Sequence, residues 1–370
     1  MKVTICLLFF FIFHTFINGQ SRFSKIIIDA ETGTPINNAH VYKKNNIFEG
    51  TATNHDGRFV FNNVKENDTL IIDHISYVPL SFKISEIEND TILLMKKVFF
   101  IQDVEVNDLT THSLMKKILD SLKLYRPKQV MYLASVISLE YEPDSSQLNI
   151  LTETITNVYH SKHNRVFFKI IKTRSNAYSK RGEKEFNNSR MVQVASIASD
   201  NIFWLKKDDI FHKNKLNSFD IKIISESKYN NYTLLKIKCS RLKKQSNSWS
   251  YIFYVYKETY FIKKIFCYND ISNYTIGFKE VKNKQYLDYS IRSKLVKTKY
   301  APPHMYKVMT IYNIDTQTQF DKDNFLSFFK IAAQRLNKYI NSWDESFWEN
   351  YNFIPLPNWV KQKIQNHDVQ

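Results

Sequence analysis

The histidines of this 370-residue sequence are its clearest candidates for a metal site. His160 and His163 form an HxxH pair in the segment YHSKHNR. A catalytic zinc site needs three protein ligands and one open position. The sequence contains no HExxH or HxxE arrangement that would supply a third ligand. We therefore predict that the pair lies in a solvated loop, and we expect no metal or other cofactor.

The sequence also lacks the motifs of the common catalytic sites. It contains no GxSxG nucleophile elbow, no P-loop and no GxGxxG, and its six glycines could scarcely supply them. The adjacent carboxylates Asp208-Asp209 and Asp344-Glu345 point apart, whereas a glycosidase needs two carboxylates that face one cleft. We therefore predict no catalytic residue and a protein that is not an enzyme, with a hydrolase of unrecognised type as the least favoured alternative.

Two cysteines lie in β-type runs that could be neighbouring strands. Cys239 lies in KIKCS and Cys267 in IFCYN. A disulfide between them is possible in an oxidising compartment. The alternative is that they are two small apolar residues buried in a core. Both interpretations stay open, because a bridge depends on the separation of the Cα atoms.

Basic charge is concentrated in the C-terminal part of the sequence. Residues 21–108 contain nine Lys and Arg against thirteen Asp and Glu, whereas the residues from 109 onward contain 42 against 23. A negatively charged partner would therefore meet the C-terminal part. The cluster SKRGEKEF, with Lys180, Arg181 and Lys184 around Gly182, predicts an exposed basic turn. Codon bias alone is the alternative explanation for this Lys-rich composition.

The N-terminal segment predicts export. Residues 1–20 carry one lysine, an apolar run from Val3 to Ile17 and a small polar end, which is typical of a signal peptide. An uncleaved anchor is the alternative, and no later stretch could cross a bilayer as a helix. We expect a protein of the periplasm, or one associated with the outer membrane or cell surface. Its partner would be an envelope protein, a glycan or an anionic lipid, and not nucleic acid.

The elements that organise the chain begin with a glycine-rich stretch. Residues 50–61, GTATNHDGRFVF, contain two of the six glycines. We predict that Gly33, Gly50, Asp56 and Gly57 lie in turns, since a tight turn needs a residue that tolerates positive φ. Asp56-Gly57 is expected to form the corner of a hairpin. Short β-rich runs at intervals of about ten residues predict a β-sandwich here.

The order of these signals resembles the carboxypeptidase regulatory-like domain, a transthyretin-like β-sandwich. The match runs from about Ser24 to Lys96 and departs mildly from the family pattern at Asn37-Asn38. The resemblance implies an accessory module without catalytic residues. Its motifs are IDAETGTPI at 28–36, AHV at 39–41, GTAT at 50–53, DGRF at 56–59 and LII at 70–72.

The larger remainder predicts an α+β domain. The segment THSLMKKILDSLKLYRP predicts a helix, because Leu114, Ile118 and Leu122 recur at four-residue spacing. Long alternating runs then predict an antiparallel meander. A second helix is expected at about 324–339, and the run WDESFWENYNFIPLP is expected to dock on the core.

The predicted fold is thus β-rich with two domains. A signal peptide (1–20) precedes a carboxypeptidase regulatory-like sandwich (21–106) and an α+β domain (107–370) with a long antiparallel sheet and a C-terminal helix. The second domain resembles the region that follows such sandwiches in many envelope proteins of Bacteroidota-type bacteria. A curved sheet with helices on one face also resembles periplasmic lipoprotein-carrier folds in architecture.

Two functions follow from these predictions. The favoured hypothesis is a non-enzymatic envelope protein that binds or scaffolds a protein, a glycan or a lipid-linked partner. The alternative is a periplasmic carrier, in which an aromatic-rich sheet curls around an acyl chain. The sequence does not predict an oligomeric state.

Overall fold

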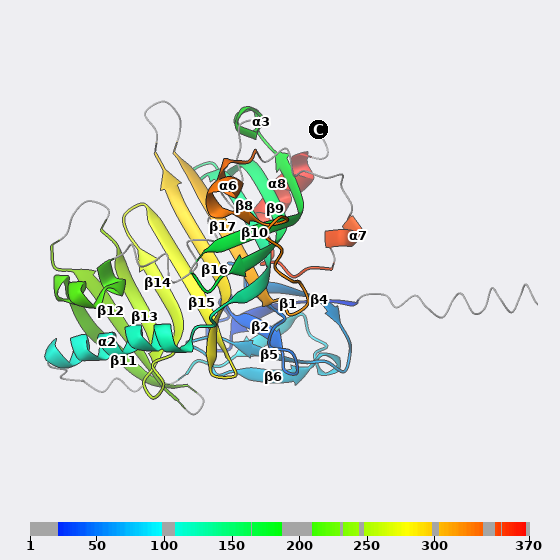
Figure 1. Cartoon of the computed structure of the whole chain (residues 1–370). Coiled ribbons are helices and arrows are strands. Elements are labelled where there is room, and N and C mark those ends of the chain that lie inside the picture. The colour runs from blue at the N-terminus through cyan, green and yellow to red at the C-terminus, as the bar shows by residue number, and fades with distance from the viewer. Residues whose placement is uncertain are drawn as a thin grey trace, which may run out of the picture.

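The computed structural model describes residues 21–97, 108–163, 165–186, 209–229, 232–243, 248–297, 303–335, 345–348 and 350–367. The expected signal peptide lies outside the described residues, as do Asp208 and Asp344. Two bodies of β-structure fill the described chain: an N-terminal sandwich (residues 21–97) and a large sheet built by the residues that follow (Figure 1).

The sandwich pairs a three-stranded sheet, in the order β4-β1-β7, with a four-stranded sheet, in the order β3-β2-β5-β6. Alternation along β4 points Phe59 and Phe61 inward, where they pack with Val41 and Ile72 from the opposite sheet. Arg58 and Asn62, which alternate with the two rings, are half-exposed. The strands are β1 Ser21–Asp29, β2 His40–Lys43, β3 Gly50–Ala52, β4 Arg58–Val64, β5 Thr69–Asp73, β6 Leu80–Lys83 and β7 Thr91–Leu94.

The glycines of the sandwich serve two different purposes. Gly33 and Gly57 have φ values of +68° and +70°, which glycine adopts without strain. The Asp56-Gly57 turn joins β3 to β4, which belong to different sheets, so it is a corner between sheets and not the expected hairpin. Gly50 lies within strand β3, where a Cβ atom would stand 2.5 Å from Nε2 of His40. Close packing, and not a turn, accounts for Gly50.

The large sheet is antiparallel throughout and has eleven strands in the order β11-β12-β13-β14-β15-β16-β17-β8-β9-β10-β18. This is the long antiparallel sheet that the alternating sequence runs predict. The strands are β8 Val130–Glu142, β9 Gln147–His160, β10 Val166–Ala177, β11 Phe219–Tyr229, β12 Tyr232–Arg241, β13 Ser250–Tyr256, β14 Ile262–Tyr268, β15 Ser272–Val281, β16 Lys284–Val296, β17 His304–Ile314 and β18 Leu326–Ser327.

One face of strands β11–β15 packs against helix α2 (Asp108–Tyr125) and two short 3-10 helices, η4 (Asp209–Phe211) and η5 (Lys213–Ser218). Figure 1 shows α2 lying across these strands. Met115 and Ile118 of α2 are fully buried against Phe253 and Ile265 of the sheet. The predicted first helix therefore forms, and its apolar side closes the core.

The opposite face of the sheet, at β8, β9 and β17, packs against the sandwich and the C-terminal segment. Ala52 of the sandwich lies in one apolar cluster with Ile137, Ile354 and Val360. The tail therefore docks on the core. Short helices border this region: α3 Lys180–Phe186, α6 Phe328–Ala333, α7 Glu345–Trp348 and α8 Asn358–His367. None of the described helices is long and apolar enough to cross a membrane.

The prediction of a helix at 324–339 is wrong for its first residues. Leu326 and Ser327 form strand β18, which pairs with Phe167 and Phe168 of β10, and α6 spans only Phe328–Ala333. Phe325 is buried, with its ring 5.2 Å from that of Phe320. This anchoring and the strand pairing override the local helical pattern. Residues 336–344 lie outside the described chain.

Cys239 and Cys267 do not form the possible disulfide. They lie on β12 and β14, both opposite Tyr251 of the intervening strand β13, and both side chains are buried and outside any disulfide. Strands two positions apart are separated by about 9.6 Å, whereas a disulfide requires Cα atoms within about 7 Å. The alternative interpretation, two small buried residues, agrees with this geometry.

Candidate functional site

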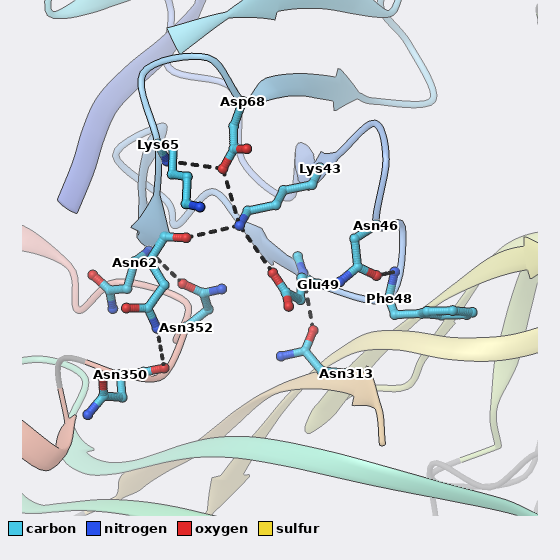
Figure 2. Close-up of polar contacts among 12 residues, drawn as sticks. Lys43, Asn46, Phe48, Glu49, Asn62, Lys65, Asp68, Asn313, Asn350 and Asn352 are labelled. Carbon is cyan, nitrogen blue, oxygen red and sulfur yellow. Dashed lines mark hydrogen bonds and ion pairs between the residues drawn. The ribbon is translucent and has the colours of Figure 1, made fainter. Parts of the chain in front are cut away.

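The C-terminal segment is held against the outer face of the sandwich by amide side chains. The backbone N–H of Asn62 donates to Oδ1 of Asn352 at 2.8 Å, and the Asn62 side chain donates to the Tyr351 carbonyl at 2.7 Å. Asn63 donates to the Asn350 carbonyl at 3.1 Å. Figure 2 shows Asn62, Asn350 and Asn352 at this seam. Side-chain amides suit the task because they satisfy the backbone of an irregular segment.

Three further hydrogen bonds extend the seam. Thr51 donates to the Phe353 carbonyl at 3.0 Å, and Asn54 donates to the Leu356 carbonyl at 3.2 Å. The backbone N–H of Asn358 donates to Oδ2 of Asp56 at 2.7 Å. Asn358 is the first residue of α8, so the Asp56 carboxylate also faces the positive end of that helix. Asp56 thus does more than occupy its predicted turn.

Beside these bonds the sandwich is tied to the large sheet. The N–H of Gly50 donates to Oδ1 of Asn313 on β17 at 3.1 Å (Figure 2). Lys43, at the end of β2, lies 3.2 Å from Asp68 and 3.4 Å from Glu49. The Gly50–Asn313 bond joins the sandwich to the sheet, whereas the two ion pairs of Lys43 lie within the sandwich.

A cavity of about 270 Å³ opens where the sandwich, strands β8–β10 and the C-terminal segment meet. We call it the seam cavity. Its walls combine cations, aromatic rings and apolar side chains. They comprise Arg22, Val60, Asn62, Ile137, Glu153, Arg174, Trp348, Tyr351, Phe353, Ile354, Pro355, Leu356 and Lys361.

Two cations, Arg22 and Lys361, lie in the wall of the seam cavity, and Arg58 lies close enough to repel Lys361. Burial and repulsion by Arg58 and Arg22 lower the pKa of Lys361, and Asp56 offsets only part of this effect. Among the described residues, no carboxylate forms an ion pair with Arg22, Arg58 or Lys361. A bound anion would reduce the repulsion among these cations, so this wall is suited to bind an anion.

The opposite wall carries a fourth cation that is already engaged. Arg174 forms an ion pair with Glu153, and its guanidinium carbon lies 4.4 Å from the centre of the Trp348 ring. Trp348 is only 5% exposed, and its indole N–H has no hydrogen-bond partner among the described residues. An indole N–H is a donor only, so a ligand acceptor could satisfy it.

A second charged region, which we call the buried charge cluster, lies between the sandwich and strands β14–β16. Asp288 accepts from Nδ1 of His40 at 2.9 Å and lies 3.4 Å from Nζ of Lys279. Lys263 is paired with Asp73 at 2.7 Å. These five residues come from both parts of the molecule.

Electrostatics in the buried charge cluster are dominated by pairing. Burial alone would raise the pKa of Asp288, but His40 and Lys279 outweigh it and hold that pKa well below its usual range. Burial lowers the pKa of Lys263, yet Asp73 and Tyr256 leave it well above the ordinary lysine value. Asp288 and Lys263 are therefore stable in their charged forms.

The His40–Asp288 pair does not complete a catalytic triad. A triad places a nucleophile on the second ring nitrogen of the histidine. Nε2 of His40 has no hydrogen-bond partner in the described chain and points toward Gly50.

The two histidines of the HxxH pair, predicted to lie in a solvated loop, differ in burial. His160, at the end of β9, is buried, and burial lowers its pKa to about 3, whereas His163 is exposed. No group of three or more metal-ligating side chains occurs within the described residues. Only half of the pair is solvated.

The predicted basic turn is instead the short helix α3. Nη2 of Arg181 lies 2.8 Å from Nδ1 of His304, and the Arg181 side chain is only 19% exposed. The prediction of an exposed basic turn is therefore wrong for Arg181. The cations in the wall of the seam cavity are scattered over residues 22, 174 and 361, and the run WDESFWENYNFIPLP supplies several of its other wall residues.

Residues 26–106 match the CarboxypepD_reg-like domain family, which confirms the module predicted for the N-terminal part. No curated protein matches the chain. Solved structures cover part of it with little sequence identity. A DUF1329 family protein from Desulfovibrio piger is 8% identical, covers 58% of this chain and 98% of its own, and has a TM-score of 0.28.

Two further solved structures have similar values. An outer membrane lipoprotein-sorting protein domain from Vibrio parahaemolyticus is 9% identical, with 59% of this chain and 97% of that chain covered and a TM-score of 0.26. A LolA superfamily protein from Nitrosomonas europaea is 10% identical, with 56% and 96% covered and a TM-score of 0.25.

Proposed function

We propose that the protein is an exported, non-enzymatic binding protein of the cell envelope. Its site is the seam cavity, and its ligand is an anionic group, a phosphate or a carboxylate, carried by an envelope glycan or lipid. The observation that carries this proposal is the presence of Arg22 and Lys361 in the cavity wall, with Arg58 close to Lys361 and no ion-pair partner for any of the three among the described residues.

The chemistry of the walls supports an anionic group with an apolar neighbour. Charged hydrogen bonds from guanidinium and ammonium groups to phosphate or carboxylate are among the stronger ones in proteins. Tyr351 and Phe353 add aromatic surface beside the cations. Ligand pockets start at roughly 300 Å³, so a cavity of about 270 Å³ suits a head group or a single sugar.

The alternative function, carriage of an acyl chain, has less support. A carrier of this kind needs an open apolar space between the sheet and its helix. In the described chain the side chains of Met115, Ile118 and Phe253 fill that region and are fully buried. The seam cavity lies at a different place and is lined by charges.

A binding experiment with three anionic probes tests the proposal. The mature protein is titrated with vesicles containing phosphatidylglycerol, with soluble alginate and with inorganic phosphate, and neutral phosphatidylcholine vesicles serve as the blank. We expect saturable binding to at least one anionic probe, weakening as salt rises. Binding to vesicles alone would identify a lipid source, and binding to alginate alone a glycan source.

Matched variants locate the site. Arg22→Gln and Lys361→Gln should each weaken binding about tenfold, the loss of one charged hydrogen bond of ~1.4 kcal/mol. Lys238→Gln removes the same charge from an exposed position on β12, outside the cavity, and should change little. Equal weakening by all three variants would mean diffuse attraction and would reject the site.

A further inference from the structure

A second cavity, of about 150 Å³, lies beside the buried charge cluster, between β2 and β5 of the sandwich and β14–β16 of the large sheet. We call it the aromatic cavity. Rings supply much of its wall: Tyr42, Tyr232, Tyr256 and Phe261. The rings of Tyr232 and Tyr256 are stacked with their centres 5.0 Å apart. Aromatic walls with a few polar groups are typical of small-molecule sites.

Three buried residues in the wall of the aromatic cavity carry polar atoms that lack a partner. His40, Asp73 and Gln285 are 4%, 7% and 7% exposed. Nε2 of His40, Oδ1 of Asp73 and Oε1 of Gln285 have no hydrogen-bond partner within the described residues. A buried polar atom left without a hydrogen bond costs about 1–3 kcal/mol. Nε2 of His40 faces Gly50, so Oδ1 of Asp73 and Oε1 of Gln285 are the two unpartnered atoms that a polar occupant of the cavity would satisfy.

Charge in the wall limits what that occupant can be. The wall holds two carboxylates, Asp73 and Glu280, and two ammonium groups, Lys263 and Lys279. Lys263 is committed to Asp73, and Lys279 to Asp288 and the Tyr312 carbonyl. The wall is balanced, so neither an anion nor a cation is favoured. An acyl chain would leave the polar atoms unsatisfied.

The tyrosines add groups that can both donate and accept. Burial raises the pKa of Tyr42 and of Tyr256 to about 12, so both hydroxyls keep their protons at neutral pH. The unpartnered atoms of Asp73 and Gln285 are acceptors only. A molecule with several hydroxyl groups can donate to these acceptors, accept from the tyrosines and lay an apolar face on a ring.

We infer that the aromatic cavity binds a neutral polyhydroxylated molecule of the size of a single sugar ring. The volume equals that of about five water molecules. The unpartnered atoms are covered from solvent, so the ligand reaches them after the half-exposed rings of Tyr42 and Tyr232 shift. This site is separate from the seam cavity and does not depend on the function proposed for it.

Titration with neutral monosaccharides tests the inference. D-glucose, D-galactose and N-acetyl-D-glucosamine are added to the whole protein, and binding is followed by calorimetry and by ligand-observed NMR. We expect saturable binding of at least one of them. Gln285→Leu removes one acceptor and should weaken binding about tenfold, corresponding to one hydrogen bond of ~1.4 kcal/mol.

A second variant keeps the test valid if Gln285→Leu does not fold. Ile47 is half-exposed at the cavity wall, so Ile47→Trp should block entry without touching the polar groups. Val78→Trp, at an exposed position outside the cavity, is the control and should bind normally. Lys361→Gln should also leave sugar binding unchanged. Absence of sugar binding, binding insensitive to Gln285→Leu and Ile47→Trp, or binding of tetramethylammonium instead would overturn the inference.

Discussion

The sandwich meets the rest of the molecule at two charged regions with opposite designs. In the buried charge cluster, unlike charges alternate, and the Lys263–Asp73 and His40–Asp288 pairs are 2.7 Å and 2.9 Å apart. At the seam cavity, Arg22 and Lys361 lie in the wall with Arg58 nearby, and none of the three forms an ion pair among the described residues. The paired charges of the first region suit a structural contact, which we call the joint. The cations of the second region are available for the proposed ligand.

Solvent access explains the difference. Asp288 and Lys279 have side chains only 3% exposed, so each would lose its hydration without compensation if it lacked a partner. Arg22 is exposed and Lys361 half-exposed, so water can stabilise them until a ligand arrives. Like charges can therefore be tolerated at the seam and not in the cluster.

The contrast between the two regions depends most on Asp288, whose neutralisation should strongly lower the free energy of unfolding. Asp288→Asn leaves the Lys279 ammonium buried without its carboxylate, and we expect unfolding free energy to fall by about 3–5 kcal/mol. Chemical denaturation measures this change. Asp90→Asn is the matched control, because the Asp90 side chain is 97% exposed in its pair with Lys25 and should change stability by less than about 0.5 kcal/mol. A loss below about 1 kcal/mol in Asp288→Asn would contradict a structural joint.

Acid should weaken the joint through His74, which lies beside the cluster. Burial, together with repulsion by Lys264, lowers the pKa of His74 from 6.5 to about 3. As pH falls below 6.5 the unfolded chain binds a proton that the folded protein does not, so stability falls, by up to ~2 kcal/mol at pH 5. His74→Gln should remove this part of the loss and leave the part that His160 contributes, because the pKa of His160 is also lowered to about 3; denaturation at pH 7 and pH 5 measures both.

The control for this pH effect is His55→Gln, at an exposed position in the turn between β3 and β4. It should leave the dependence on pH unchanged. If His74→Gln and the unmodified protein lost equal stability between pH 7 and pH 5, the titration would belong to another group.

The smallest expected effect is a gain, and not a loss, of stability in Lys361→Gln. Lys361→Gln relieves repulsion by Arg58 and Arg22, so we expect stability to stay equal or to rise by up to ~0.5 kcal/mol, with a weaker response to salt. Thermal unfolding at low and high salt measures both. A clear loss of stability would show that Lys361 holds the fold together and would remove the contrast between the two regions.

Local sequence signals were enough for the sandwich and the large sheet. Gly33 and Gly57 are predictable because few residues adopt positive φ. Strand β12 is predictable because Leu235, Ile237 and Cys239 alternate with polar residues on the other face. In both cases the information lies within a few neighbouring residues.

The candidate sites could not be predicted in this way. Arg22, Arg174 and Lys361 lie on separate elements, and only the completed tertiary structure brings them to one cavity. The same reason explains the error at Leu326, where pairing with a distant strand replaced a helical turn. The charges of the basic cluster at Arg181 are adjacent in sequence, which favours the prediction of an exposed turn. Its arginine is nevertheless half-buried beside His304.

The hydrogen bonds of the seam join residues that are 287 to 302 positions apart in the chain. Closing so long a loop is slow, and the sandwich leaves the ribosome well before its seam partners exist. A truncated product that ends before residue 348 could still build much of the sandwich, but it would lack the wall that carries Trp348 through Lys361. Under the proposed function, only a chain translated to its end would capture the ligand.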